Sequence, residues 1–94
     1  MLTKNNITDI CLQLQADKQN KSWNIRPKYR EAFQDGIAAA VAVLKSCEGM
    51  SPDWVLEKLR AELNNDPYLS ANKSDAYQQA VRIAMSRVHA LKRP

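Results

Sequence analysis

Apolar residues recur along most of the chain at intervals of three and four positions, the spacing that places side chains on one face of an α-helix. This periodicity predicts four helical segments, at residues 7–20, 27–47 and 51–64 and from residue 74 almost to the end. Two glycines in 94 residues and scattered β-branched residues give no support to a turn-rich β architecture. The pattern therefore predicts an all-α protein, a compact four-helix bundle with short loops that forms one domain over residues 1–94.

The predicted helices have their own start and stop signals. Asn5 or Asn6 is the expected cap of the first helix, because a short polar side chain can accept a bond from a free backbone N–H. Pro27 suits the first turn of the second helix, and Gly49 can adopt the left-handed conformation that ends it. Residues 51–53, Ser-Pro-Asp, combine a cap, a proline and an acid, and so predict the start of the third helix.

The second segment is expected to be the central core helix. Its apolar face consists of Tyr29, Phe33, Ile37, Ala40, Val41, Leu44 and Cys47. The alanines at 38, 39 and 42 are expected to widen this face. Gly36 lies inside the helix, where glycine costs about 1 kcal/mol relative to alanine, and its small neighbours indicate that another helix packs closely there. Cys11 and Cys47 fall on apolar faces, which favours reduced core thiols over the disulfide that an exported protein could form.

The net charge of +4 is unevenly distributed. The balance is +3 over residues 1–31, −3 over residues 32–70 and +4 over residues 71–94. A basic connection, residues 18–30, joins the first two helices and contains aromatic residues as well as cations. Its candidate residues for binding a partner or nucleic acid are Lys18, Lys21, Trp23, Arg26, Lys28 and Arg30. Cations neutralise phosphates and an exposed ring stacks on a base. Alternatively, Trp23 folds back onto the core and the cations are ordinary solvated surface.

The last helix carries the second group of candidate binding residues. They are Arg82, Arg87, His89, Lys92 and Arg93. Arg82, His89 and Arg93 recur on the face away from the apolar stripe, and such a row can follow a phosphate backbone or an acidic protein surface. The alternative is a solvated face whose cations are stabilised by the helix dipole. The functional interpretation requires this row and the 18–30 connection to converge into one cationic surface.

Several functional classes are not expected. The chain lacks a phosphate-binding glycine loop, a paired-histidine zinc motif and a nucleophile elbow, so we expect neither an enzyme nor a cofactor. His89 has no second histidine and no cysteine pair at ligand spacing, so no metal site is expected. The longest apolar run, residues 37–44, is less than half a bilayer span, and the first residues lack the apolar stretch of a signal peptide. We expect a cytoplasmic protein with no membrane partner.

Residues 28–40, Lys-Tyr-Arg-Glu-Ala-Phe-Gln-Asp-Gly-Ile-Ala-Ala-Ala, resemble the main helix of small accessory proteins of phages and prophages. These include anti-CRISPR and other anti-defence inhibitors. The resemblance covers about one helix, carries over no functional residue, and implies a non-enzymatic inhibitor or adaptor that docks on a host protein complex handling nucleic acid. Two other functions stay open. One is direct binding of DNA or RNA through the 18–30 connection and the last helix. The other is an assembly subunit that forms a homodimer through apolar surface of the 51–64 helix.

Overall fold

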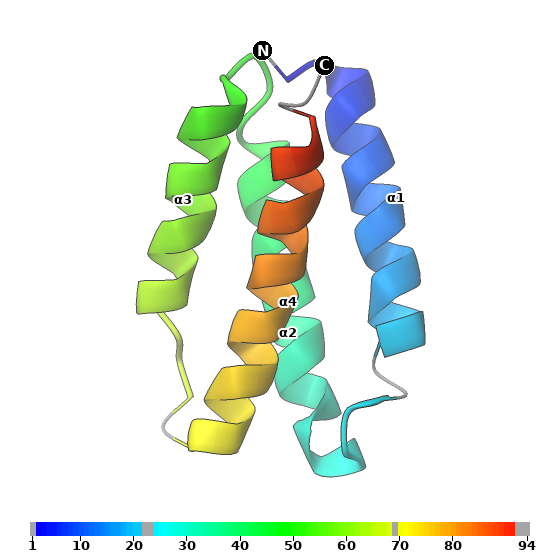
Figure 1. Cartoon of the computed structure of the whole chain (residues 1–94), viewed down its shortest axis with the longest axis vertical. Helices are drawn as coiled ribbons and strands as arrows, with labels where there is room; N and C mark the ends of the chain where they lie inside the picture. Colours follow the sequence, from blue (N-terminus) through cyan, green and yellow to red (C-terminus); the bar gives the residue numbers. More distant parts are fainter. Residues whose placement is uncertain (1, 22–23, 69, 92–94) are drawn as a thin grey trace.

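A computed structural model of the protein describes residues 2–21, 24–68 and 70–91. Its elements are α1 (Lys4–Lys21), the short 3₁₀-helix η2 (Pro27–Tyr29), α2 (Arg30–Lys45), α3 (Pro52–Asn64) and α4 (Ala71–Ala90). Consecutive α-helices run in opposite directions, so α1 and α3 point one way and α2 and α4 the other (Figure 1). The predicted all-α fold, a bundle of four helices, is confirmed.

Helices α2 and α4 form the centre of the bundle, and α1 and α3 flank this pair on opposite sides (Figure 1). The two central helices approach closely because small residues line their contact. These residues, all buried, are Ala32, Gly36 and Ala40 of α2 and Ala76, Ala80 and Ala84 of α4. A Cβ atom at Gly36 would lie 2.5 Å from the carbonyl oxygen of Tyr77. The interpretation of Gly36 as a point of close helix packing is therefore confirmed.

Larger apolar side chains from all four helices fill the space around this contact. Those with less than 2% of their surface exposed include Phe33, Ile37, Leu44, Leu14, Val55, Leu59, Val81 and Val88. The expectation that the alanines at 38 and 42 widen the core face is wrong, because both are exposed. They lie on the side of α2 opposite Phe33 and Ile37. Both cysteines are free thiols, Cys47 buried and Cys11 half-buried.

The helix starts show which polar side chains act as caps. In α1 the cap is Thr3 rather than Asn5 or Asn6: the Thr3 hydroxyl accepts a bond from the Asn6 backbone N–H (3.1 Å), and the Asn6 side chain accepts one from the Thr3 N–H (3.0 Å). In α3 the predicted cap is confirmed, since the Ser51 hydroxyl accepts a bond from the Trp54 N–H at 3.2 Å. A helix cap is therefore identified by the bonds that a polar side chain makes, not by its position next to the helix start alone.

The start of the chain closes one end of the core. Leu2 is 2% exposed, and its backbone pairs with the α2–α3 loop through bonds of 2.8 Å to the Met50 carbonyl and from the Gly49 N–H. Gly49 has a φ of 82°, a left-handed conformation that a glycine adopts without strain. The turn at Gly49 places the Gly49 N–H and the Met50 carbonyl opposite the backbone of Leu2. Across the described residues, every helix is too short or too polar to traverse a lipid bilayer.

Candidate binding surface

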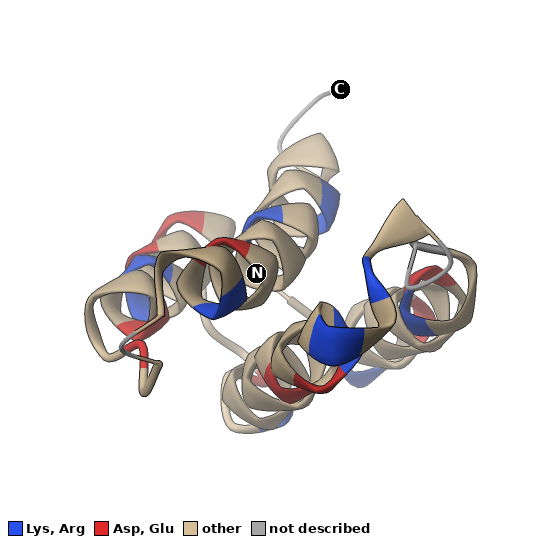
Figure 2. Cartoon of the chain, turned by 90° about the horizontal axis from the view of Figure 1, so that it is seen from below, with Lys and Arg blue, Asp and Glu red and all other residues tan. Residues whose placement is uncertain are grey.

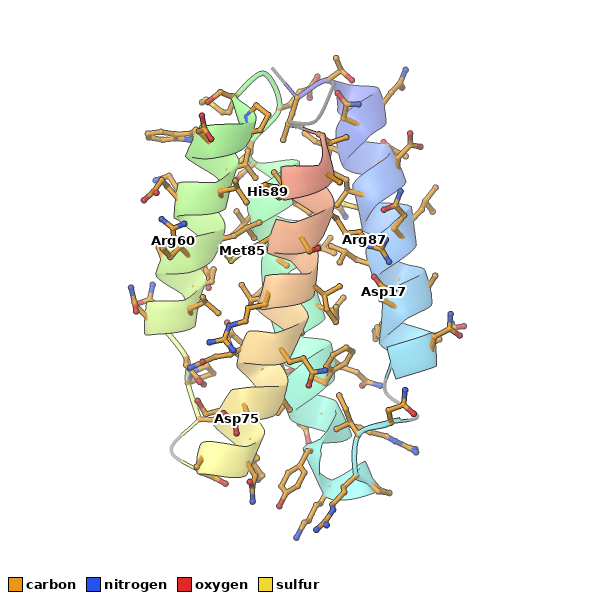
Figure 3. All side chains as sticks on the ribbon, viewed as in Figure 1. Asp17, Arg60, Asp75, Met85, Arg87 and His89 are labelled. Carbon is orange, nitrogen blue, oxygen red and sulfur yellow. The ribbon has the colours of Figure 1, made fainter. Side chains whose placement is uncertain are left out.

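The two basic segments do not converge. The connection between α1 and α2 lies at the end of the bundle where α4 begins, and α4 then runs the length of the bundle to the other end (Figure 1). Arg87 and His89 lie toward that other end (Figure 3). Helix α4 has 20 residues, which corresponds to about 30 Å at 1.5 Å per residue. The continuous cationic surface expected from the sequence is therefore not present among the described residues.

The structure does not describe the side chains of four predicted binding residues. Trp23, Lys92 and Arg93 lie outside the described residues, and the side chain of Lys21 is not described either. Lys18 is half-buried near the end of α1, and Arg30 is exposed at the start of α2. Seen from the end of the bundle that holds the connection, basic and acidic segments alternate over the described ribbons (Figure 2).

A small basic cluster does form at this end, around Tyr29. The ammonium group of Lys28 lies 5.1 Å from the centre of the Tyr29 ring, and Arg26 is exposed beside it. The Tyr29 hydroxyl accepts a bond of 3.0 Å from the side chain of Asn72 in the first turn of α4. Contact with Lys28, followed by Asn72 and the charge of Arg26, outweighs the effect of burial and lowers the pKa of Tyr29 below its usual value of 10. The connection thus meets the start of α4, not its basic second half.

Arg87 makes an internal ion pair and is not a free surface cation. Its Nη2 atom lies 2.9 Å from both carboxylate oxygens of Asp17, and its Nε atom lies 3.2 Å from one of them. Asp17 is 7% exposed. The pair fastens α1 to α4 (Figure 3). Asp17 stands in the polar last turns of the first helix, but it follows Leu14 by three positions and so lies on the apolar face.

Arg82 and His89 lie on a different face of α4, along a groove shared with α3. The groove has a volume of about 430 Å³. Its lining residues are Leu56 and Arg60 of α3 and Arg82, Met85, Ser86, His89 and Ala90 of α4. In Figure 3, Met85 and His89 lie on the side of α4 that faces α3, and Arg60 lies on α3 at about the level of Met85.

The floor of this groove is apolar and its rim is basic. Leu56 is buried and Met85 half-buried, whereas Arg60, Arg82 and His89 are exposed. The guanidinium of Arg60 lies 2.6 Å from a Glu57 carboxylate oxygen, but both side chains are more than half exposed, so this pair contributes little to stability. We did not expect Arg60 to be a site residue. Its position four residues after Leu56, on the same side of α3, is the signal that could have identified it.

The hollow continues along the outer face of α4. A second depression of about 540 Å³ shares Arg82 and Ser86 with the groove and extends to Ile83, Gln79 and Asp75. Arg82 stands at the junction, where its Nη2 atom lies 3.4 Å from the side-chain oxygen of Gln78. The surface formed by both depressions is long enough to contact an extended or helical segment, and we call it the α3–α4 groove.

The loop between α3 and α4 is held by acidic side chains. Asp66 accepts bonds from the Ser74 hydroxyl, from the Tyr68 N–H (2.9 Å) and from the Gln78 amide (3.3 Å). Burial alone would raise the pKa of Asp66, but these three bonds together lower it. The Tyr68 hydroxyl donates to Asp35 of α2, and this bond above all raises the pKa of Tyr68 to about 12. These contacts explain why Ser74, the expected start of the last helix, lies one turn inside α4.

Comparison with protein-family models, with curated proteins and with solved structures finds no match for this chain. Within the described residues, no three His, Cys, Asp or Glu side chains are grouped as a metal site requires. The α3–α4 groove is therefore interpreted from its own side chains.

Proposed function

We propose that this protein is a binding protein without catalytic activity, which docks through the α3–α4 groove on an acidic surface of a host protein complex that handles nucleic acid. The observation that carries the proposal is the groove itself, in which two helices surround an apolar floor with Arg60, Arg82 and His89. Charged residues at the rim of an interface set orientation and association rate, whereas apolar contacts at its centre provide most of the affinity.

An acidic protein segment fits this groove better than a phosphate backbone does. A helix with Asp or Glu on either side of a large apolar residue would pair with the cations and also cover Leu56 and Met85. A phosphate backbone would pair with Arg60 and Arg82 but leave the apolar floor exposed to water, without the gain that apolar burial provides. The choice of a host complex as partner rests on the resemblance of residues 28–40 to phage accessory inhibitors.

Direct nucleic-acid binding is the second candidate, and the basic cluster at the other end of the bundle favours it. Arg26 and Lys28 are exposed there next to the Tyr29 ring, which is the combination that single-stranded nucleic acid contacts. If this candidate is right, the affinity of the protein for random single-stranded oligonucleotides should fall steeply as the salt concentration rises.

Two charge-reversal variants separate the candidates. The first, Arg60→Glu with Arg82→Glu, alters the groove, and the second, Arg26→Glu with Lys28→Glu, makes the same change in charge at the opposite end. The tagged protein is used to capture partners from nuclease-treated bacterial lysate, and the captured protein is purified and titrated. We expect the groove variant to lose at least about tenfold in affinity, because its glutamates would set like charges against an acidic partner, and the end variant to bind normally.

The opposite pattern contradicts the proposal. If the groove variant binds the purified partner normally, the α3–α4 groove is not the docking site. If no protein is captured after nuclease treatment, while random oligonucleotides bind at low salt and the end variant abolishes that binding, the second candidate is supported instead.

A further inference from the structure

Helices α1 and α2 lie side by side on the other side of the molecule from α3 and the front of α4 (Figure 1). The face that they form carries exposed apolar side chains. Leu12 of α1 is 64% exposed, the largest value among the large apolar residues described. Ala38 and Ala42 of α2 are exposed as well. None of these side chains contributes to the core or to the proposed docking groove, so their exposure calls for a separate explanation.

Leu12 lies at the edge of a groove that could receive a side chain like itself. The groove between α1 and α2 has a volume of about 390 Å³, and its lining includes Ile7, Cys11 and Val41 together with Leu12. A projecting leucine and an apolar groove therefore occur on one face. This combination suits a two-fold symmetric interface, because the same patch of each copy contacts itself and must be self-complementary.

The exposed side of α2 is complementary to itself in charge and in size. Asp35, Ala38, Ala42 and Lys45 are all exposed, and their spacings of three, four and three residues place them along one stripe of the helix. The stripe is symmetric about residue 40. If two α2 helices pack antiparallel across this point, each Lys45 meets the Asp35 of the other copy and each Ala38 meets an Ala42. Small side chains at the centre let two helices approach to about 8 Å, the close end of the usual range.

The acid in this stripe is held in place before any partner arrives. Asp35 accepts a bond from the Tyr68 hydroxyl, which fixes the carboxylate without neutralising it. Lys45 lines the α1–α2 groove beside Val41. The charged pair would therefore flank the apolar contact, an arrangement that sets the direction of packing.

We propose that this face, defined by Leu12, Ala38, Ala42, Asp35 and Lys45, binds a second copy of the chain. In the dimer the α2 helices are antiparallel, and each Leu12 enters the α1–α2 groove of the other copy. The homodimer considered from the sequence used apolar surface of the 51–64 helix, but α3 contributes nothing to the face proposed here. The inference is independent of the proposed function, because both α3–α4 grooves stay exposed on the outside of the dimer.

The mass of the protein in solution tests the proposal. We expect light scattering coupled to gel filtration, at up to about 200 μM because dimer populations depend on concentration, to show a dimer for the unmodified chain. Leu12→Asp should be monomeric at the same concentration with an unchanged helical circular dichroism spectrum. Met50→Asp is the matched control: Met50 is 42% exposed and belongs to the α2–α3 loop, so the variant should stay dimeric.

A charge exchange tests the antiparallel register separately. Lys45→Glu and Asp35→Lys should each weaken the dimer by at least about tenfold, since each sets like charges against one another. The variant that carries both changes should recover the dimer. Asp35→Lys and the double variant both lose the Tyr68 contact, so any effect of that loss on the fold of the single chain is the same in both. A dimer that returns in the double variant therefore reports the contact between the two copies. A monomeric unmodified chain at the highest concentration, or a dimer that persists in Leu12→Asp, overturns the proposal.

Discussion

Replacing Gly36 by alanine tests the packing of α2 on α4, because the change adds a single methyl group at their closest approach. The new Cβ atom would lie 2.5 Å from the Tyr77 carbonyl oxygen, 2.7 Å from the Ala80 Cβ atom and 3.2 Å from the Tyr77 carbonyl carbon. All three neighbours belong to the backbone of α4 or are fixed directly to it. Rotation of a side chain therefore cannot relieve the overlap, and the two helices must move apart.

The size of the effect follows from two opposing terms. Carbon atoms in good contact lie about 3.5–4.0 Å apart, so the helices must separate by roughly 1 Å where Phe33, Ile37 and Val81 are fully buried around the contact. Overpacking of a core costs about 1–3 kcal/mol, and the rigid neighbours of Gly36 favour the upper end. Against this cost, alanine stabilises a helix by about 1 kcal/mol relative to glycine. We expect a net loss of roughly 2 kcal/mol, which lowers Tm by about 8–16 °C in a domain of this size.

Thermal and urea unfolding followed by circular dichroism measure this loss. Ala61→Gly is the control, because it replaces an exposed alanine of α3 that lies outside both proposed surfaces and should cost only the propensity difference of about 1 kcal/mol. Ala80→Gly should cost less stability in the Gly36→Ala variant than in the unmodified protein, since in the variant it also removes the Cβ contact, although the carbonyl contact stays. A Gly36→Ala variant that unfolds at a higher temperature than the unmodified protein would refute the reasoning, because propensity alone would then decide the outcome.

Three further predictions concern polar contacts. Arg87→Met should destabilise the fold by about 1–3 kcal/mol because it leaves the Asp17 carboxylate buried without its partner, whereas Asp17→Leu combined with Arg87→Met should be close to neutral in urea unfolding. The Asp35 bond raises the pKa of Tyr68 to about 12, so the folded state holds the Tyr68 proton more tightly than the unfolded chain does. The stability that this proton contributes is complete below pH 10 and is lost as the pH rises through 12. Tyr68→Phe should therefore reduce the fall of the unfolding midpoint at alkaline pH. Ser51→Ala should cost about 0.5–2 kcal/mol through loss of the α3 cap, and an unchanged midpoint would count against the cap.

Much of the fold could be predicted from the sequence, because helix periodicity and strong start signals are local. The Ser-Pro-Asp start of α3 and the close packing at Gly36 were predicted correctly for this reason. The exposed Ala38 and Ala42 were not, since alanine is compatible with both faces of a helix. The start of α4 was placed three residues late because Ser74 resembles a cap. Its hydroxyl instead bonds to Asp66, a partner eight residues away.

The candidate site was harder to predict because it depends on which helix ends meet. The Asp17–Arg87 pair joins positions 70 residues apart, and no local pattern indicates such a partner. The separation of the two basic segments, however, follows from topology. In an up-and-down bundle with short loops, the connection after the first helix lies where the fourth helix begins. The basic second half of α4 must then lie near the opposite end, which the segment order alone could have indicated.

The two proposed surfaces together have a consequence that neither has alone. Helices α2 and α4 pack on each other at the centre, and α1 and α3 lie on opposite sides of this pair (Figure 1). The core therefore separates the α1–α2 face from the α3–α4 groove. A dimer through Leu12 would therefore carry two outward-facing grooves, and a partner with repeated acidic segments would be bound by both at once. Effective concentration then raises affinity without any new contact. On this reasoning Leu12→Asp weakens binding only to a multivalent partner, whereas Arg60→Glu with Arg82→Glu weakens binding to a single segment as well. Equal losses in both assays for the Leu12 variant would mean that the α1–α2 face contacts the partner itself.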